Sequence, residues 1–180
     1  DVPRRAQYIR LLVGEMQRMA SHLVGVGTYL VDLGAFTPVL WTFRDREGIL
    51  SLFEALGGSR FNVNYIRVGG VLHDFPKNWL KECEAYLDQL EKNMVELENL
   101  ITGNEIFEAR TQGVGYIDPQ QAIAYGLTGP MLRACGVNWD LRVNRPYMAY
   151  REVAVNPQVR QEGDCYARYK VRMQEVTESI

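Results

Sequence analysis

Cysteine and histidine are scarce in this sequence of 180 residues. The three cysteines, Cys83, Cys135 and Cys165, lie far apart and form no CxxC pair, and the only histidines are His22 and His73. Structural zinc sites and iron–sulfur clusters usually take four Cys or His ligands from the protein. We therefore expect no metal centre built from this chain alone. An odd number of isolated cysteines also fits a reducing compartment better than a disulfide-bonded scaffold.

A strong excess of one charge and a long apolar run are also missing. The 20 basic and 22 acidic residues leave a net charge of -2, which argues against a protein that binds nucleic acid. The most apolar stretch, residues 23–36, contains three glycines and Asp32, whereas a transmembrane helix needs about 20 mostly apolar residues. The length and the 47% of hydrophobic residues indicate one globular domain that does not span a bilayer by itself.

Apolar residues near the start of the chain recur at helical spacing. Pro3 suits the first turn of a helix, and the apolar seam predicts a helix over residues 3–31 that packs against other helices. The seam consists of Ile9, Leu12, Met16, Met19, Leu23, Val26 and Leu30. Glu15, Arg18 and His22 follow one flank of it. This polar stripe is either a partly solvated edge of the helix or a semi-buried stripe that faces a cavity or a partner.

A break and a second helix follow. Gly34 and Pro38 argue against helical structure over residues 32–42. A helix is predicted over residues 43–56, with Phe43 among its inward-facing side chains and two glycines after its end.

The third helical pattern is the clearest one. Asp74 is the expected N-cap, and Gly103 the expected end, of a helix whose seam holds Leu90 and whose other faces are largely acidic. Asp118 and Asp164 are expected to cap a short helix and the last helix. Two stretches are expected to be extended or loop: residues 60–71 and 139–159.

Asp32 is the carboxylate most worth attention on chemical grounds. It follows an apolar turn and precedes Gly-Ala-Phe, which predicts that it is buried, and a buried carboxylate needs a partner or a proton. The alternative is an acid at the end of a helix that bonds to nearby backbone amides.

Longer stretches of the sequence resemble a known family. The first is PRRAQYIRLLVGEMQRMASHLVGVGTYLVDLGAFTPVLWTFRDRE, and further blocks follow in order: SRFNVNYIRVGGV, ARTQGVGYID, GLTGPMLRACGVNWDLR, RPYMAY and EGDCYARYKVRMQEVTESI. Together they are similar to the central region of the D-type subunit of NADH-quinone oxidoreductase, respiratory complex I, whose mitochondrial equivalent is the 49-kilodalton subunit. Residues 1–180 are then expected to be a single domain, the central part of a longer subunit without its N-terminal hairpin region and C-terminal segment.

The resemblance implies a fold as well. It is mainly α, a helical bundle with short extended and loop segments, related to the large subunit of nickel–iron hydrogenases. Those hydrogenases hold their metal with two CxxC pairs. This chain has none, so nickel–iron chemistry is not expected here.

The resemblance further implies a role in quinone reduction. In complex I, the D-type and B-type subunits form the quinone cavity, the B-type subunit carries the terminal iron–sulfur cluster, and quinone reduction is coupled to proton translocation. NADH, FMN and the other clusters belong to other subunits, so this chain is expected to bind no cofactor and to be inactive alone. Its expected partners are the B-type and C-type subunits, the membrane-arm subunits and quinone. Its expected location is peripheral, on the cytoplasmic side of a bacterial cell membrane.

The resemblance implies functional roles for four residues of this chain. The family's cavity aspartate falls on Asp32, the residue we expect to act in catalysis, and its cavity threonine falls on Thr28. Arg67 matches an arginine close to the terminal cluster of the B-type subunit. Many members have a histidine where this chain has Asn62, and because an amide does not titrate, redox-linked protonation there is expected to be weak or absent. The family's quinone-bonding histidine and tyrosine lie upstream of residue 1.

A second hypothesis stays open at this point. The chain is alternatively a scaffold subunit of a related membrane-bound hydrogenase or ferredoxin-linked quinone reductase complex. The region upstream of residue 1 discriminates the two, because a CxxC pair there indicates a hydrogenase and a hairpin histidine indicates a quinone site.

Overall fold

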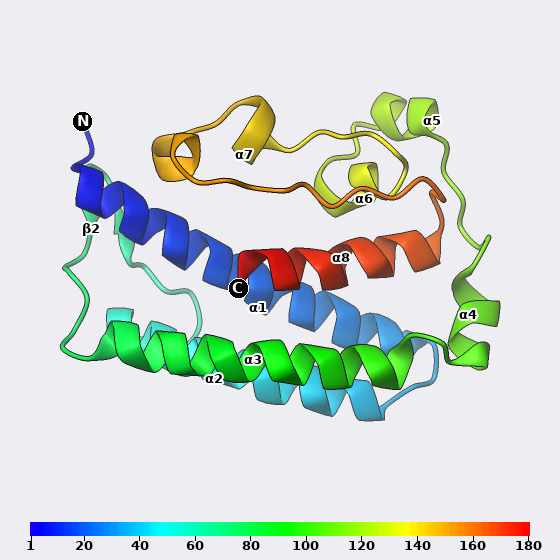
Figure 1. Ribbon diagram of the computed structural model, residues 1–180, viewed down its shortest axis with the longest axis horizontal. Coiled ribbons are helices and arrows are strands. Elements are labelled where there is room, and N and C mark those ends of the chain that lie inside the picture. Colours follow the sequence, from blue (N-terminus) through cyan, green and yellow to red (C-terminus); the bar gives the residue numbers. More distant parts are fainter.

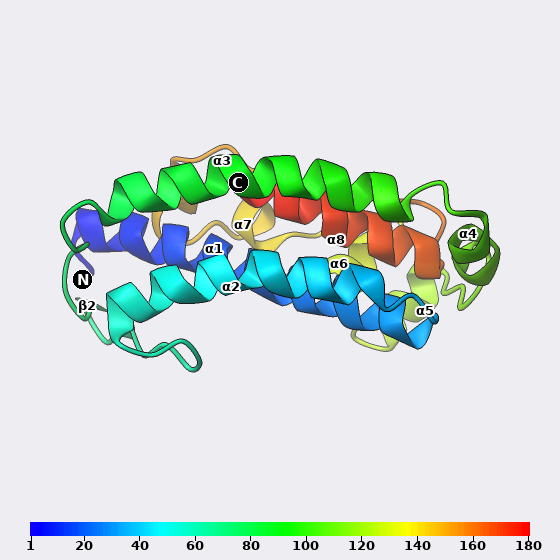
Figure 2. The same cartoon turned by 90° about the horizontal axis from the view of Figure 1, so that it is seen from below.

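Four long helices lie side by side along the molecule (Figure 1), in a computed structural model that describes all 180 residues. They are α1 (Arg4–Asp32), α2 (Thr37–Gly57), α3 (Trp79–Ile101) and α8 (Cys165–Ser179). Each runs opposite to the one before it, so α1 and α3 point the same way and α2 and α8 point back (Figure 1, Figure 2). α1 and α3 each pack on both α2 and α8. The predicted mainly α bundle is confirmed.

Short elements complete the fold. The helices are α4 (Glu105–Thr111), α5 (Pro119–Ala124), α6 (Gly129–Arg133), α7 (Leu141–Asn144) and the 3-10 helix η1 (Met148–Arg151). The strands β1 (Ile66–Arg67) and β2 (Gly70–Val71) form one antiparallel hairpin. The chain from α5 to η1 lies over α1 and α8 on the side away from α3 (Figure 1). No helix in the molecule is both long enough and apolar enough to cross a membrane.

The apolar seam of α1 is confirmed, and it contributes to one large core. This core contains 24 buried hydrophobic residues, drawn from the four long helices together with Tyr65 and Phe107. Leu12 is the one member of the predicted seam that is only partly buried. The helix ends one residue later than predicted.

The start of α2 corrects the sequence prediction. Helical structure begins at Thr37, six residues before the predicted start, because Pro38 lies in the first turn, where its missing N–H leaves no hydrogen bond unmade. Phe43, predicted to face inward, is 44% exposed. Thr42 and Asp45 take the inner positions at this level and are buried instead.

A close contact between α1 and α2 explains why Thr42 faces inward. A Cβ atom at Gly27 would collide with the Thr42 hydroxyl, so glycine is required at this position for the two helices to approach. Gly48 plays the same part between α2 and α3, where a Cβ atom would collide with the ring of Tyr86.

Helix α3 begins later than predicted, because Asp74 is not its N-cap. Asp74 instead accepts a hydrogen bond from the amide of Phe75 at 2.7 Å and pairs with Arg5 at 2.6 Å. The helix begins after Asn78, whose φ of 68° lies in the left-handed region and so cannot be part of the helix. The apolar seam inside α3 and its exposed acidic face are as predicted.

The second half of the chain is only partly as predicted. Asp118 and Asp164 are N-caps, since each carboxylate accepts backbone N–H groups of the helix that follows. Residues 60–71 contain the predicted extended structure as the β1–β2 hairpin. Residues 139–159 contain α7 and η1 and no strand, because the Asp140 side chain accepts from the amide of Arg142 and starts a helical turn. The helices α4 and α6 lie outside the sequence predictions.

Replacing Leu90 by Ala should lower the free energy of unfolding by about 2–5 kcal/mol, since the side chain is fully buried in the core and truncation leaves a cavity. Leu80→Ala on the same helix is the matched control: Leu80 is 51% exposed and should lose less than about 1 kcal/mol. Urea denaturation of the purified chain measures both values. Equal losses for the two variants would contradict the position of α3 in the bundle.

Candidate functional site

The two predicted cavity residues, Thr28 and Asp32, lie one turn apart on α1 and are both exposed. The prediction that Asp32 is buried is therefore wrong for this chain. Its apolar neighbour Leu30 turns to the core on the opposite side of the helix, and no other element covers Asp32. Thr28 Oγ1 donates to the carbonyl of Val24 at 2.8 Å, whereas the Asp32 carboxylate makes no hydrogen bond within the chain. The alternative, an acid bonded to nearby amides, is also not observed.

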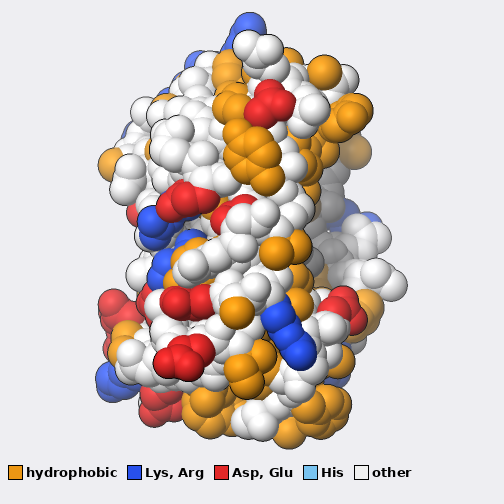
Figure 3. Space-filling model, turned by 90° about the vertical axis from the view of Figure 1, so that its right-hand side faces the viewer, with side chains coloured by type: hydrophobic (Ala, Val, Ile, Leu, Met, Phe, Trp, Pro, Cys, Tyr) orange, Lys and Arg blue, Asp and Glu red, His pale blue; other side chains and the backbone are white.

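A ridge of large apolar side chains stands exposed on the neighbouring helix α2 and at its N-cap, Phe36. Phe36, Leu40 and Phe43 are 65%, 57% and 44% exposed, and their spacing of four and three residues places them along one side of the helix. Figure 3 looks at the end where α1 joins α2 and shows hydrophobic side chains gathered on that end of the molecule. Large apolar side chains exposed in a row along one helix are typical of an interaction site.

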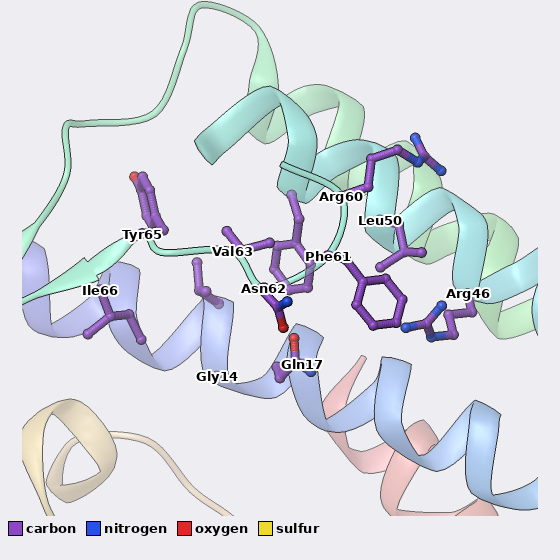
Figure 4. Close-up of a pocket in the computed structure, with 12 residues that line it drawn as sticks. Gly14, Gln17, Arg46, Leu50, Arg60, Phe61, Asn62, Val63, Tyr65 and Ile66 are labelled. Carbon is purple, nitrogen blue, oxygen red and sulfur yellow. The ribbon is translucent and has the colours of Figure 1, made fainter. Parts of the chain in front are cut away.

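Further along the same two helices lies a cavity of about 450 Å³. Gln17 of α1, Arg46 of α2 and the segment from Arg60 to Ile66 line it (Figure 4). Asn62 lies in this segment, is exposed, and has a left-handed backbone with φ of 55°. Its amide and that of Gln17 point toward one another (Figure 4).

The cavity and the predicted cavity residues share one side of α1. Gln17, Thr28 and Asp32 are exposed and differ by 11 and 4 positions, which are close to whole turns of a helix. At 1.5 Å per residue, Gln17 and Asp32 lie roughly 22 Å apart along the axis. We call this surface, formed by the exposed side chains of α1 and α2 from Gln17 and Arg46 to Asp32 and Phe36, the outer face. The structure thus brings Thr28, Asp32 and Asn62 onto one surface.

Arg67 lies apart from that surface, on strand β1. Its side chain is exposed, and its carbonyl oxygen accepts a hydrogen bond from Arg10 of α1. The hairpin is thereby attached to the first part of α1. Proximity of Arg67 and Asn62 to a cluster stays a prediction.

The polar stripe of α1 matches neither of the two interpretations drawn from the sequence. Glu15 is buried, and it accepts hydrogen bonds from Arg18 at 3.0 Å, Arg142 at 3.1 Å, Ser179 at 2.7 Å and the hydroxyl of Tyr150. The stripe is neither a solvated edge nor the wall of a cavity. It packs against the second half of the same chain.

His22 extends the same arrangement. Its Nε2 lies 2.6 Å from Glu175, which also accepts from Arg133 Nε at 2.9 Å. Arg133 is 3.5 Å from Asp140, and Asp140 pairs with Arg142 at 2.8 Å. We call this connected set the buried charge network. Its carboxylates and guanidinium groups are equal in number: Glu15, Asp140 and Glu175 against Arg18, Arg133 and Arg142.

The acids of this network are held ionised. Burial raises the pKa of the Glu15 carboxyl, but the Tyr150 hydrogen bond and the positive charge of Arg18 outweigh it, so the pKa lies below its ordinary value. Burial likewise raises the pKa of Glu175, and the contacts with His22 and Arg133 bring it below the ordinary value. The network is thus a set of ion pairs that fixes one side of α1 and leaves the outer face free.

Sequence reasoning missed most of these residues. Arg142 and Glu175 carry no local pattern that pairs them with Glu15 and His22, which lie 127 and 153 positions away. Arg133 and Asp140 join these two contacts, and no spacing in the sequence predicts that either. The outer face had a detectable signal, since Phe36, Leu40 and Phe43 repeat at helical spacing opposite to the inward residues of α2. The predicted break over residues 32–42 concealed it.

Comparison with known proteins gives the family. Residues 32–180 match the family described as respiratory-chain NADH dehydrogenase, 49 Kd subunit. The chain belongs to this family. It is 47% identical over its full length to the D-type subunit of NADH-quinone oxidoreductase from Clostridium beijerinckii, covering 49% of that protein.

Other relatives in the same family are similar to the same extent. The H-type subunit of NAD(P)H-quinone oxidoreductase from Synechococcus sp. is 51% identical over 99% of this chain and 46% of its own length. The chloroplastic H-type subunit of Hordeum vulgare is 47% identical over all of this chain and 46% of its own length. The chain therefore spans about half the length of the curated relatives it matches.

Replacing Glu175 by Gln should lower the free energy of unfolding at neutral pH by roughly 3 kcal/mol, because Arg133 is left buried beside an uncharged partner. In the unchanged protein, the stability from Glu15 and Glu175 is complete above the ordinary pKa of 4.5 and is lost as the pH falls through their lowered folded-state values. The variant should lose less stability on acidification.

Urea denaturation at a series of pH values between about 3 and 7 measures this effect. Glu91→Gln, at an exposed position of α3, is the matched control and should change neither the stability at neutral pH nor its acid dependence. An acid dependence of Glu175→Gln identical to that of the unchanged protein would show that Glu175 is not ionised in an ion pair.

Proposed function

We propose that this chain forms, together with a B-type iron–sulfur partner subunit, the wall of the cavity in which quinone is reduced. One observation carries the proposal: Thr28 and Asp32 lie on the same uncovered outer face as the cavity beside Asn62. A carboxylate without a hydrogen-bond partner in the chain, on the same face as exposed phenylalanines, suits a surface that another subunit covers and that encloses an apolar ring. The family membership supports the same assignment.

Asp32 is proposed to act on the protons of this reaction. Reduction of a quinone to a quinol consumes two electrons and two protons. The terminal iron–sulfur cluster of the partner supplies the electrons. A carboxylate in the enclosed cavity orients and reprotonates the imidazole that bonds a quinone oxygen. In the family, that imidazole lies upstream of residue 1.

The proposal includes the assembly around this chain. Its partners are the B-type and C-type subunits and the membrane-arm subunits, and the assembly lies on the cytoplasmic face of the cell membrane and couples quinone reduction to proton translocation. The fold is proposed, from the family resemblance, to be related to the large subunit of hydrogenases. The relatives are named for NADH in one case and for NAD(P)H in another, so the electron donor is left open.

No cofactor is assigned to the chain itself. It has no group of three or more His, Cys, Asp or Glu side chains placed to hold a metal ion, and so its residues do not fit a nickel–iron centre. Metal analysis of the purified chain should find less than stoichiometric iron, zinc and nickel. A stoichiometric ion of any of these would contradict this part of the proposal.

In the full-length subunit, Asp32→Asn should leave the complex assembled and lower quinone reduction by about tenfold or more, because an amide neither accepts nor returns a proton. Reduction of the terminal cluster by NADH, followed by electron paramagnetic resonance, should stay normal. Asp88→Asn, a change at an exposed carboxylate on α3, is the matched control and should retain full activity. Wild-type quinone reduction by the Asp32→Asn complex at every pH between about 6 and 9 would refute the assignment.

A further inference from the structure

Arg46 is the one residue of a charged run on α2 that has no partner of opposite charge. In the sequence Arg44-Asp45-Arg46-Glu47, Arg44 pairs with Asp45 at 2.8 Å, and Glu47 pairs with Arg60. Arg46 makes no ion pair in the chain, and its Nε is buried without any hydrogen-bond partner. A guanidinium that is partly removed from water needs an anion to compensate.

The surroundings of Arg46 compensate its charge only in part. The guanidinium carbon lies 5.9 Å from the ring centre of Phe43 and 5.2 Å from that of Phe61, distances at which a cation is attracted to an aromatic face. This attraction is weaker than that of a carboxylate and leaves the buried Nε–H without a hydrogen bond. Figure 4 shows the guanidinium directed toward the Phe61 ring at one end of the cavity.

The nearby carboxylates of the chain are directed to other groups. Asp45 turns away to α3, where its Oδ1 accepts from Asn93 at 2.8 Å as well as from Arg44, and its Oδ2 is buried without a hydrogen bond. Glu47 and Glu54 both bind Arg60. An anion for Arg46 therefore comes from outside the residues of this chain.

We propose that Arg46 receives a carboxylate from an Asp or Glu side chain of the protein partner that covers the outer face. This inference rests on the proposed function for the existence of that partner and adds the chemistry of its contact. Beside Arg46, the cavity offers the apolar walls of Leu50, Phe53 and Phe61 and the amide of Asn62. The methylene groups of an acidic side chain cover such walls, while its carboxylate reaches the guanidinium.

A protein segment fits this surface better than a free anion does. The apolar ridge of Phe36, Leu40 and Phe43 continues from Arg46 along the same face, and an inorganic ion would leave it exposed to water. A partner that buries the ridge also encloses Arg46, and enclosure strengthens the ion pair. The planar fork of arginine, with Nε on one edge, binds a carboxylate in a bidentate manner that lysine does not reproduce.

The test compares association of the full-length subunit with its iron–sulfur partner subunit. Arg46→Met should weaken this association at least about tenfold, as truncation of one member of an enclosed charge pair does, and Arg46→Lys should restore it only in part. Arg145→Met, at an exposed arginine without a side-chain partner, is the matched control and should bind like the unchanged subunit. The thermal midpoint of the free subunit should not fall in Arg46→Met, because the residue makes no ion pair there.

Charge reversal identifies the contact. Arg46→Glu should abolish association, and one Asp→Arg or Glu→Arg change on the partner surface should restore it. Unchanged binding by Arg46→Met would overturn the inference, and so would a lower thermal midpoint that accounts for the weaker binding. Tight binding of inorganic phosphate at Arg46, with partner association unaffected by Arg46→Met, would assign the site to a free anion instead.

These outcomes are separate from a failure of the proposed function. Asp32→Asn reports on quinone reduction and the Arg46 variants report on association. Normal quinone reduction in Asp32→Asn together with weakened association in Arg46→Met would retain the contact and reject the quinone role.

Discussion

The structure depends on the ion pairs that join α1 to the second half of the chain. Glu15 and His22 on α1 reach Arg142 and Glu175, and Arg133 and Asp140 connect these two contacts into one network. Buried charges are stable only when every member has a partner. Removal of one side chain leaves its partner charged and buried without compensation, which lowers the free energy of unfolding. The short helices α6 and α7, which have little core of their own, are held against α1 and α8 in this way.

Helix α1 thus has three sides with different roles. Its apolar seam enters the core, its charged stripe binds the second half of the chain, and its outer face is left uncovered. Because the first two sides are occupied within the chain, Thr28 and Asp32 are held in a fixed position although neither side chain forms a hydrogen bond to another element. A surface presented this rigidly is suited to meet a second subunit, since little ordering remains to be done on association.

At Asn62, the backbone conformation and the chemistry of the side chain are independent of each other. Its φ of 55° lies in the left-handed region, where asparagine and histidine are both enriched among non-glycine residues. The same loop conformation therefore accepts either residue. Asn62 thus serves as part of the cavity wall, and its amide cannot titrate near neutral pH as the histidine that the family resemblance implies at this position would.

The sequence by itself determined the features that depend on local spacing. The seams of α1 and α3 and the caps at Asp118 and Asp164 follow from neighbours within one or two turns, and the structure confirms them. Only the tertiary structure decided the pairing of His22 with Glu175, which lies 153 positions away. It also decided the exposure of Asp32, because no segment of the chain covers the side of α1 opposite to Leu30. Helical periodicity states which residues share a face, but whether a face is covered depends on segments that are distant in the chain.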